Sequence, residues 1–132
     1  MQDQTGRTDQ AHAAVVARDE ALRASLVLLL EMCGMEAAGF AELEEFLHVS
    51  RLDEQFLFVD CGVDGGGVPA AIEQLRRRGW QGIAGLMTET DPPPDWALPE
   101  GPCHVLVKPF SADEVLSVVR AAERKPARTE CN

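Results

Sequence analysis

Basic residues are scarce in this 132-residue sequence: 12 Lys and Arg stand against 22 Asp and Glu, for a formal net charge of −10. A protein that grips nucleic acid regardless of base sequence needs a basic face, so this balance excludes that class. Long apolar runs are also missing, and the longest helical one, residues 26–30, is far too short to span a membrane. Residues 1–12 are polar and acidic and lack the features of a signal peptide. We therefore expect a cytoplasmic protein that binds neither nucleic acid nor membranes.

Sequence motifs typical of metal sites or of a disulfide framework are absent as well. The cysteines, at positions 33, 61, 103 and 131, contain no CxxC pair, and no histidine stands at metal-ligand spacing. In a reducing compartment such cysteines are free thiols. The triple glycine at 65–67 matches no phosphate-binding motif.

What the sequence does have is a regular alternation of apolar segments typical of strands and amphipathic segments typical of helices. Helical spacing predicts helices within 18–34, 41–53 and 68–79 and a last helix over 111–125. Strands are predicted at 13–17, 35–40, 56–59, 83–87 and 103–107. This order predicts an α/β domain with a doubly wound, five-stranded parallel sheet. We expect the domain to cover 13–124, between a disordered tail at 1–12 and a C-terminal tail at 125–132.

One connection departs from the alternation. Five prolines lie between residues 92 and 102, where a fourth helix would stand before the last strand. Proline removes a backbone donor and disfavours helix in the residue before it. The sequence therefore predicts a proline-rich loop in place of that helix.

Polar side chains follow the predicted strands at their carboxyl ends, where open α/β sheets hold their sites. Asp60 follows the third strand, Thr88 the fourth and Lys108 the fifth, and Arg18 and Asp19 come just after the first. Each has a plainer interpretation. Asp60 could be a turn residue, Lys108 and Arg18 solvated surface cations, and Thr90 could take the place of Thr88.

The segments "VVARDEALRASL", "FLFVDCGVDGGGV", "GIAGLMT" and "HVLVKPFSADEV" together resemble the receiver domain of bacterial two-component response regulators. The resemblance covers roughly residues 13–124. It implies that Asp60 is the phosphoacceptor, that Thr88 is the hydroxyl residue closing the fourth strand, and that Lys108 is the lysine of the phosphorylation pocket. It also implies a cis Lys108–Pro109 bond and a histidine kinase, or another signalling protein, as the partner.

The sequence departs from the family where family members carry two adjacent acids after the first strand. Counting back from Arg23, those positions hold Ala17 and Arg18. Asp19 and Glu20 are displaced acids, one to two places too late, and Asp19 fits a helix N-cap better. The aromatic switch residue of the family is replaced by Val105, which makes this an atypical, degenerate member.

The departures change the expected charge of the pocket. Asp60, Lys108 and Arg18 sum to +1, whereas three carboxylates and a lysine would sum to −2 and attract Mg²⁺. We therefore expect no metal or other cofactor, with Mg²⁺ weak or absent. The fork of an arginine suits a carboxylate, so Arg18 is expected to pair with Asp60 in place of the metal.

The leading hypothesis is a stand-alone atypical receiver, monomeric or weakly dimeric, that acts by protein contact, with phosphorylation at Asp60 impaired or independent of Mg²⁺. One alternative is an ordinary Mg²⁺-dependent receiver whose acids are misregistered. A flavodoxin-like cofactor carrier would need a Ser, Thr or Gly loop after the first strand, and "VARDEALR" provides none. A phosphohydrolase with an aspartyl nucleophile would want an acid where Gly62 stands, so an enzyme is not expected.

Overall fold

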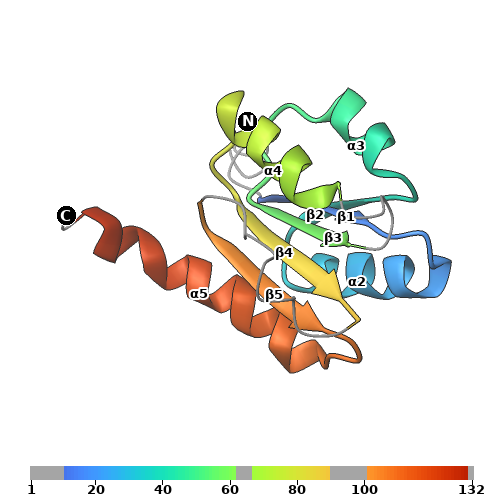
Figure 1. The fold of residues 1–132 in the computed structure, drawn as a ribbon. Coiled ribbons are helices and arrows are strands. Elements are labelled where there is room, and N and C mark those ends of the chain that lie inside the picture. The colour runs from blue at the N-terminus through green and yellow to red at the C-terminus, as the bar shows by residue number, and fades with distance from the viewer. Residues whose placement is uncertain (1–10, 62–66, 90–100, 131–132) are drawn as a thin grey trace, which may run out of the picture.

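A computed structural model describes residues 11–61, 67–89 and 101–130, and along 123–130 it describes the backbone alone. Five parallel strands form one sheet in the order β2-β1-β3-β4-β5 (Figure 1). The strands are β1 (His12–Val16), β2 (Glu36–Phe40), β3 (Phe56–Asp60), β4 (Ile83–Thr88) and β5 (Cys103–Val107). The helices are α2 (Glu20–Met32), α3 (Leu43–Val49), α4 (Val68–Arg77) and α5 (Ala112–Glu130). The predicted doubly wound α/β fold is confirmed.

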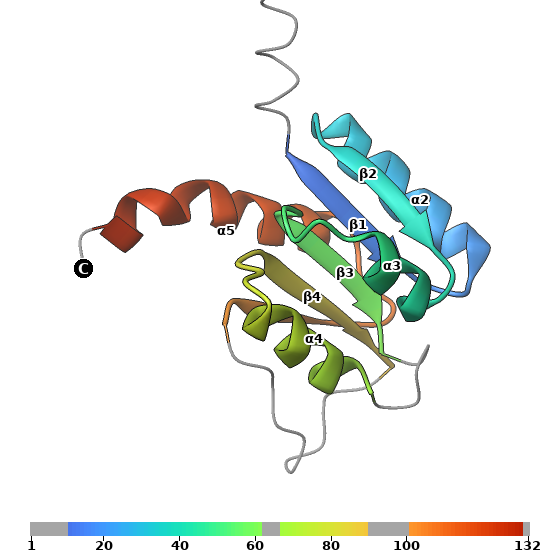
Figure 2. The same cartoon turned by 90° about the horizontal axis from the view of Figure 1, so that it is seen from above.

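Helices cover both faces of the sheet, α3 and α4 on one face and α2 and α5 on the other (Figures 1 and 2). Each face has its own apolar core. Leu43, Phe46, Ile72 and Leu75 fill the first, and the second is filled mainly by Leu26, Leu30, Met87, Val115 and Val118. Because both faces are covered, the central strands are apolar throughout: residues 56–59 and 83–87 are all buried.

Local signals set the helix ends. The Asp19 carboxylate accepts hydrogen bonds from the backbone amides of Ala21 and Leu22, which confirms its predicted N-cap role in α2. The Ser111 hydroxyl accepts from the amide of Glu114 at the start of α5. Gly34 ends α2 with φ 91°, in the left-handed region that glycine adopts without strain.

The boundaries of the domain differ slightly from the prediction. His12, assigned to the N-terminal tail, belongs to β1, where it pairs with Glu36 of β2. The predicted C-terminal tail begins at 125, and the backbone of α5 continues through it to Glu130. Pro126 lies within this helix and lacks the N–H that would donate to the carbonyl four residues before it, while alanine, glutamate, arginine and lysine, which form helices well, lie on both sides of it.

The predicted proline-rich loop falls mainly on 90–100, which lies outside the described residues. In the part of the chain that the structure describes, no helix is long and apolar enough to cross a membrane.

Candidate functional site

Asp60 and Lys108 meet at the carboxyl edge of the sheet. β3 and β5 flank β4, so their ends bring the two side chains to the same edge, where Lys108 Nζ lies 2.8 Å from Asp60 Oδ2. The pair is half-buried, with 15% of the Asp60 side chain and 24% of the Lys108 side chain exposed. The Lys108–Pro109 peptide bond that follows is cis, as the resemblance implied. The structure therefore brings together the predicted acid and the predicted lysine.

Thr88 completes this group from the strand between them. The backbone amide of Lys108 donates to the carbonyl of Thr88 at 2.7 Å, which ties the end of β5 to the end of β4. The hydroxyl oxygen of Thr88 is buried and has no hydrogen-bond partner among the described residues. A buried hydroxyl without a partner costs about 1–3 kcal/mol, so a further polar group that bonded to it would be favoured here.

The environment of Lys108 favours its charged form. Burial alone lowers the pKa of the ammonium group. The hydrogen bond and negative charge of Asp60 outweigh that effect, with a further contribution from Glu89, so the pKa lies above its ordinary value. Lys108 is therefore a fixed positive charge beside the Asp60 carboxylate.

Arg18 takes a different partner from the predicted one. Its guanidinium donates from Nε and from an Nη atom to the two carboxylate oxygens of Glu42, at 3.2 and 3.1 Å. The pair is exposed, with 60% of the Arg18 side chain and 47% of the Glu42 side chain accessible. The expected pairing of the Arg18 fork with Asp60 is thus corrected, because Glu42, just before α3, occupies that fork.

The positions of the two missing acids hold no carboxylate in the structure either. Ala17 is fully buried after β1, and its carbonyl accepts a hydrogen bond of 2.7 Å from the guanidinium of Arg23. Asp19 faces the amides that it caps, and Glu20 lies in the exposed first turn of α2. The two displaced acids therefore sit at the start of a helix, and neither has a described contact with Asp60.

The acid pair that the receiver resemblance implies as Mg²⁺ ligands is missing here, and a magnesium site needs one or two carboxylates in a near-octahedral shell completed by water. Ala17 offers a methyl group, Arg18 a cation, and Asp60 shares one oxygen with Lys108. Within the described ranges, no three His, Cys, Asp or Glu side chains lie together so as to hold a metal ion.

Two residues of this edge were not singled out from the sequence. Glu89 follows Thr88, and its carboxylate lies 3.6 Å from Lys108 Nζ. Its place directly after a site residue was the only available signal. Cys61 follows Asp60, and burial, with the charge of Asp60, raises the pKa of its thiol to about 12. That thiol stays protonated at neutral pH and is not a nucleophile.

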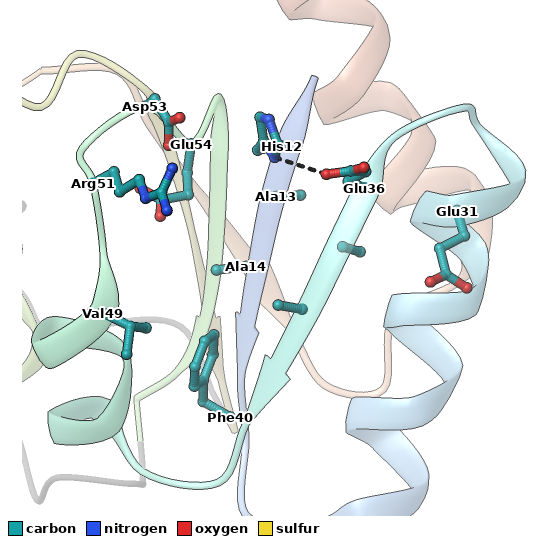
Figure 3. A pocket seen from close by; sticks show the side chains of 12 residues that line it. His12, Ala13, Ala14, Glu31, Glu36, Phe40, Val49, Arg51, Asp53 and Glu54 are labelled. Atoms are coloured by element: carbon teal, nitrogen blue, oxygen red, sulfur yellow. Dashed lines mark ion pairs between the residues drawn. The ribbon is translucent and has the colours of Figure 1, made fainter. Parts of the chain in front are cut away.

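A cavity of about 470 Å³ lies along β1 and β2, at the side of the sheet away from β5 (Figure 3). Its wall includes His12 and Glu36, whose side chains approach to 3.3 Å, and Arg51 and Glu54 from the segment between α3 and β3. The cavity is distinct from the Asp60 site, because none of Asp60, Thr88 or Lys108 lines it.

The chain was compared with known protein families, curated proteins and solved structures. No family model matches the chain, and no curated protein matches it. Solved structures do match. A CheY-like receiver domain protein from Methanospirillum hungatei superimposes with a TM-score of 0.77 at 15% identity, over 92% of this chain and 99% of that one.

Two further receiver structures agree with it. A CheY-like receiver domain from Methylobacillus flagellatus gives a TM-score of 0.71 at 19% identity, over 86% of this chain and 98% of that one. The structure described as the BeF3-activated DrrB receiver domain gives a TM-score of 0.72 at 17% identity, over 87% of this chain and 99% of that one. The chain therefore has the receiver fold of CheY-like response regulators, and Asp60, Thr88 and Lys108 lie at the carboxyl edge of its sheet.

Proposed function

We propose that this chain is an atypical receiver module of two-component signalling, with Asp60 as a phosphoacceptor that works without a tightly bound Mg²⁺. One observation carries the proposal: the Asp60 carboxylate lies 2.8 Å from the Lys108 ammonium, and the strand between them ends in Thr88, whose buried hydroxyl has no partner among the described residues. The receiver fold supports it, and a histidine kinase or another signalling protein is the proposed partner.

The geometry suits phosphoryl transfer to the acid. A carboxylate oxygen of Asp60 forms a bond to phosphorus while the bond between phosphorus and the donor's leaving group breaks, and the leaving group keeps the electron pair. Lys108 balances the charge that arrives on the phosphoryl oxygens. The Thr88 hydroxyl supplies a donor that has no partner among the described residues before the transfer. The module carries a signal by this modification and by protein contact, and we propose no enzymatic turnover.

The replacement of the acid pair by Ala17 and Arg18 sets this module apart. Arg18 follows β1, next to β3 in the sheet, so it stands one residue beyond the position level with Asp60. Its pair with Glu42 is exposed and therefore weak, about 0–1 kcal/mol. A phosphoryl dianion on Asp60 can compete for such a guanidinium. We propose that Arg18 takes over part of the charge balance that Mg²⁺ provides in an ordinary receiver.

The test is labelling by a small phosphodonor, acetyl phosphate, followed by intact-mass spectrometry with Mg²⁺ or with a chelator. We expect slow labelling of the parent that the chelator does not change, and no labelling of Asp60→Asn. Arg18→Asp adds a carboxylate beside Asp60. In the presence of Mg²⁺ it should be labelled on the order of tenfold faster than the parent, and the chelator should abolish this gain. Arg18→Asn is the control, because it removes the cation and the Glu42 pair without adding a ligand.

Two results would contradict the proposal. Parent protein that labels quickly with Mg²⁺ and loses this in the chelator is an ordinary Mg²⁺-dependent receiver. Parent protein with no label on Asp60 under either condition is not a phosphoacceptor.

A further inference from the structure

Lys108 is shared between two carboxylates. Its Nζ lies 2.8 Å from Asp60 Oδ2 and 3.6 Å from Glu89 Oε2. The Asp60 side chain is 15% exposed and that of Glu89 is 83% exposed, so the two acids differ in access to solvent. The lysine therefore has an inner partner within the pocket and an outer partner facing solvent.

The backbone fixes this arrangement. Thr88 pairs with Val107 in the register of β4 and β5, and the amide of Lys108 donates to the carbonyl of Thr88. The residues that follow these two strands, Glu89 and Lys108, are therefore neighbours on adjacent strands. Any side chain at position 89 starts beside the lysine, and glutamate is long enough to reach its ammonium group.

We propose that Glu89 is an anion-repelling residue that competes with an incoming phosphoryl group for Lys108 and so slows the modification of Asp60. The second half of this statement rests on the proposed function, and the first half does not. Asp60, Lys108 and Glu89 sum to −1 (Asp60 −1, Lys108 +1, Glu89 −1), so Glu89 lowers by one the charge that an approaching phosphate meets at Lys108.

The size of the effect follows from exposure. Glu89 is largely in solvent, and exposed ion pairs are worth at most about 1 kcal/mol, which corresponds to a change of about fivefold or less. At 0.1 M ionic strength, exposed charges farther apart than about 10 Å are largely screened, so salt weakens the repulsion between Glu89 and a phosphate that is still approaching. We therefore expect about a threefold effect at low salt and a smaller one at high salt.

The first arm of the test measures anion binding without phosphoryl transfer. The chain has only two lysines, Lys108 and Lys125, so NMR of carbon-13 lysine separates their signals, and Lys125→Arg assigns them. Inorganic phosphate is titrated into the parent, Glu89→Gln and the control Glu45→Gln, which makes the same charge change on an exposed residue of α3. We expect the Lys108 signal of Glu89→Gln to saturate at about threefold lower phosphate than in the parent and in the control.

The second arm measures the rate at which acetyl phosphate labels Asp60 in the same three proteins. Glu89→Gln should label about threefold faster than the parent, and Glu45→Gln at the parental rate. Equal phosphate binding in the parent and Glu89→Gln overturns the inference, as does an equal gain in the control. If no protein labels while phosphate binding changes as expected, the phosphoacceptor proposal is wrong and the anion-repelling role of Glu89 is supported.

Discussion

The two ends of the sheet treat their polar groups in opposite ways. At the amino end, Trp80 is 2% exposed and its indole N–H donates to the carbonyl of Glu54 at 2.8 Å. Arg76 donates to the carbonyls of Gly82 and Pro102, and its guanidinium carbon lies 4.4 Å from the centroid of the Trp80 ring. These hydrogen bonds join the starts of β3, β4 and β5 to the end of α4.

At the carboxyl end, by contrast, the Thr88 hydroxyl is buried and has no hydrogen-bond partner among the described residues. Lys108 there forms ion pairs with two carboxylates, those of Asp60 and Glu89. Buried polar groups in proteins are generally paired, so a buried hydroxyl without a partner among the described residues is an exception. The comparison therefore separates an amino end whose polar groups are paired from a carboxyl end that can accept a further polar group, in keeping with the proposed function.

The largest effect is expected from Trp80→Ala. The substitution opens a cavity in the core over α4 and leaves the Glu54 carbonyl without its donor. We expect a loss of about 3–5 kcal/mol in the free energy of unfolding. Urea unfolding followed by circular dichroism measures it, because the substitution removes a fluorescent reporter. Leu28→Ala, on the 58% exposed side chain of Leu28, is the control and should change stability by about 0.5 kcal/mol or less.

A smaller loss is expected from Arg76→Ala. It removes charged donors from the carbonyls of Gly82 and Pro102 and the contact with Trp80, for a cost of about 2 kcal/mol. Arg76→Lys should recover less than half of that loss in stability, because a lysine ammonium group cannot reach both carbonyls and stack on the Trp80 ring as the planar guanidinium does. Arg77→Ala, at the exposed neighbouring position, is the control. If Arg76→Ala unfolds at the same urea concentration as Arg77→Ala, the amino end is not the stabilising region.

The sequence predicted the parts of the fold that depend on local signals. Apolar periodicity located all five strands, and the caps at Asp19 and Ser111 were visible as single residues before apolar stripes. The end of α5 was placed at 125 because the residues after it are polar and carry no apolar stripe, while the helix continues to Glu130. Local signals of this kind act over a few residues, which is why boundaries are less predictable than elements.

The site was predictable only in part, for a different reason. Asp60, Thr88 and Lys108 could be placed because the ends of parallel strands meet at one edge. The partner of Arg18 could not, since Glu42 lies 24 residues away and reaches it only after β2 pairs with β1. Similarly, the ion pair between Glu89 and Lys108 depends on the register of β4 and β5. Long-range pairings between charged side chains leave no periodic trace in a sequence.

The smallest effect, and one of opposite sign, is expected from Thr88→Val. Valine has nearly the shape of threonine and removes a buried hydroxyl that has no partner among the described residues. We expect the free energy of unfolding to rise by about 1 kcal/mol, because the desolvation cost of that hydroxyl disappears. The same variant should lose the phosphoryl group of Asp60 faster or accept it more slowly than the parent, since the donor kept for it is gone. Thr88→Ser keeps the hydroxyl and loses a methyl group, so it should be less stable than the parent while accepting the phosphoryl group at the same rate.

The stability of Thr88→Val decides whether the two ends of the sheet really differ. If Thr88→Val is less stable than the parent, the Thr88 hydroxyl is already paired in the unmodified protein. The carboxyl end would then have its buried polar groups paired just as the amino end does.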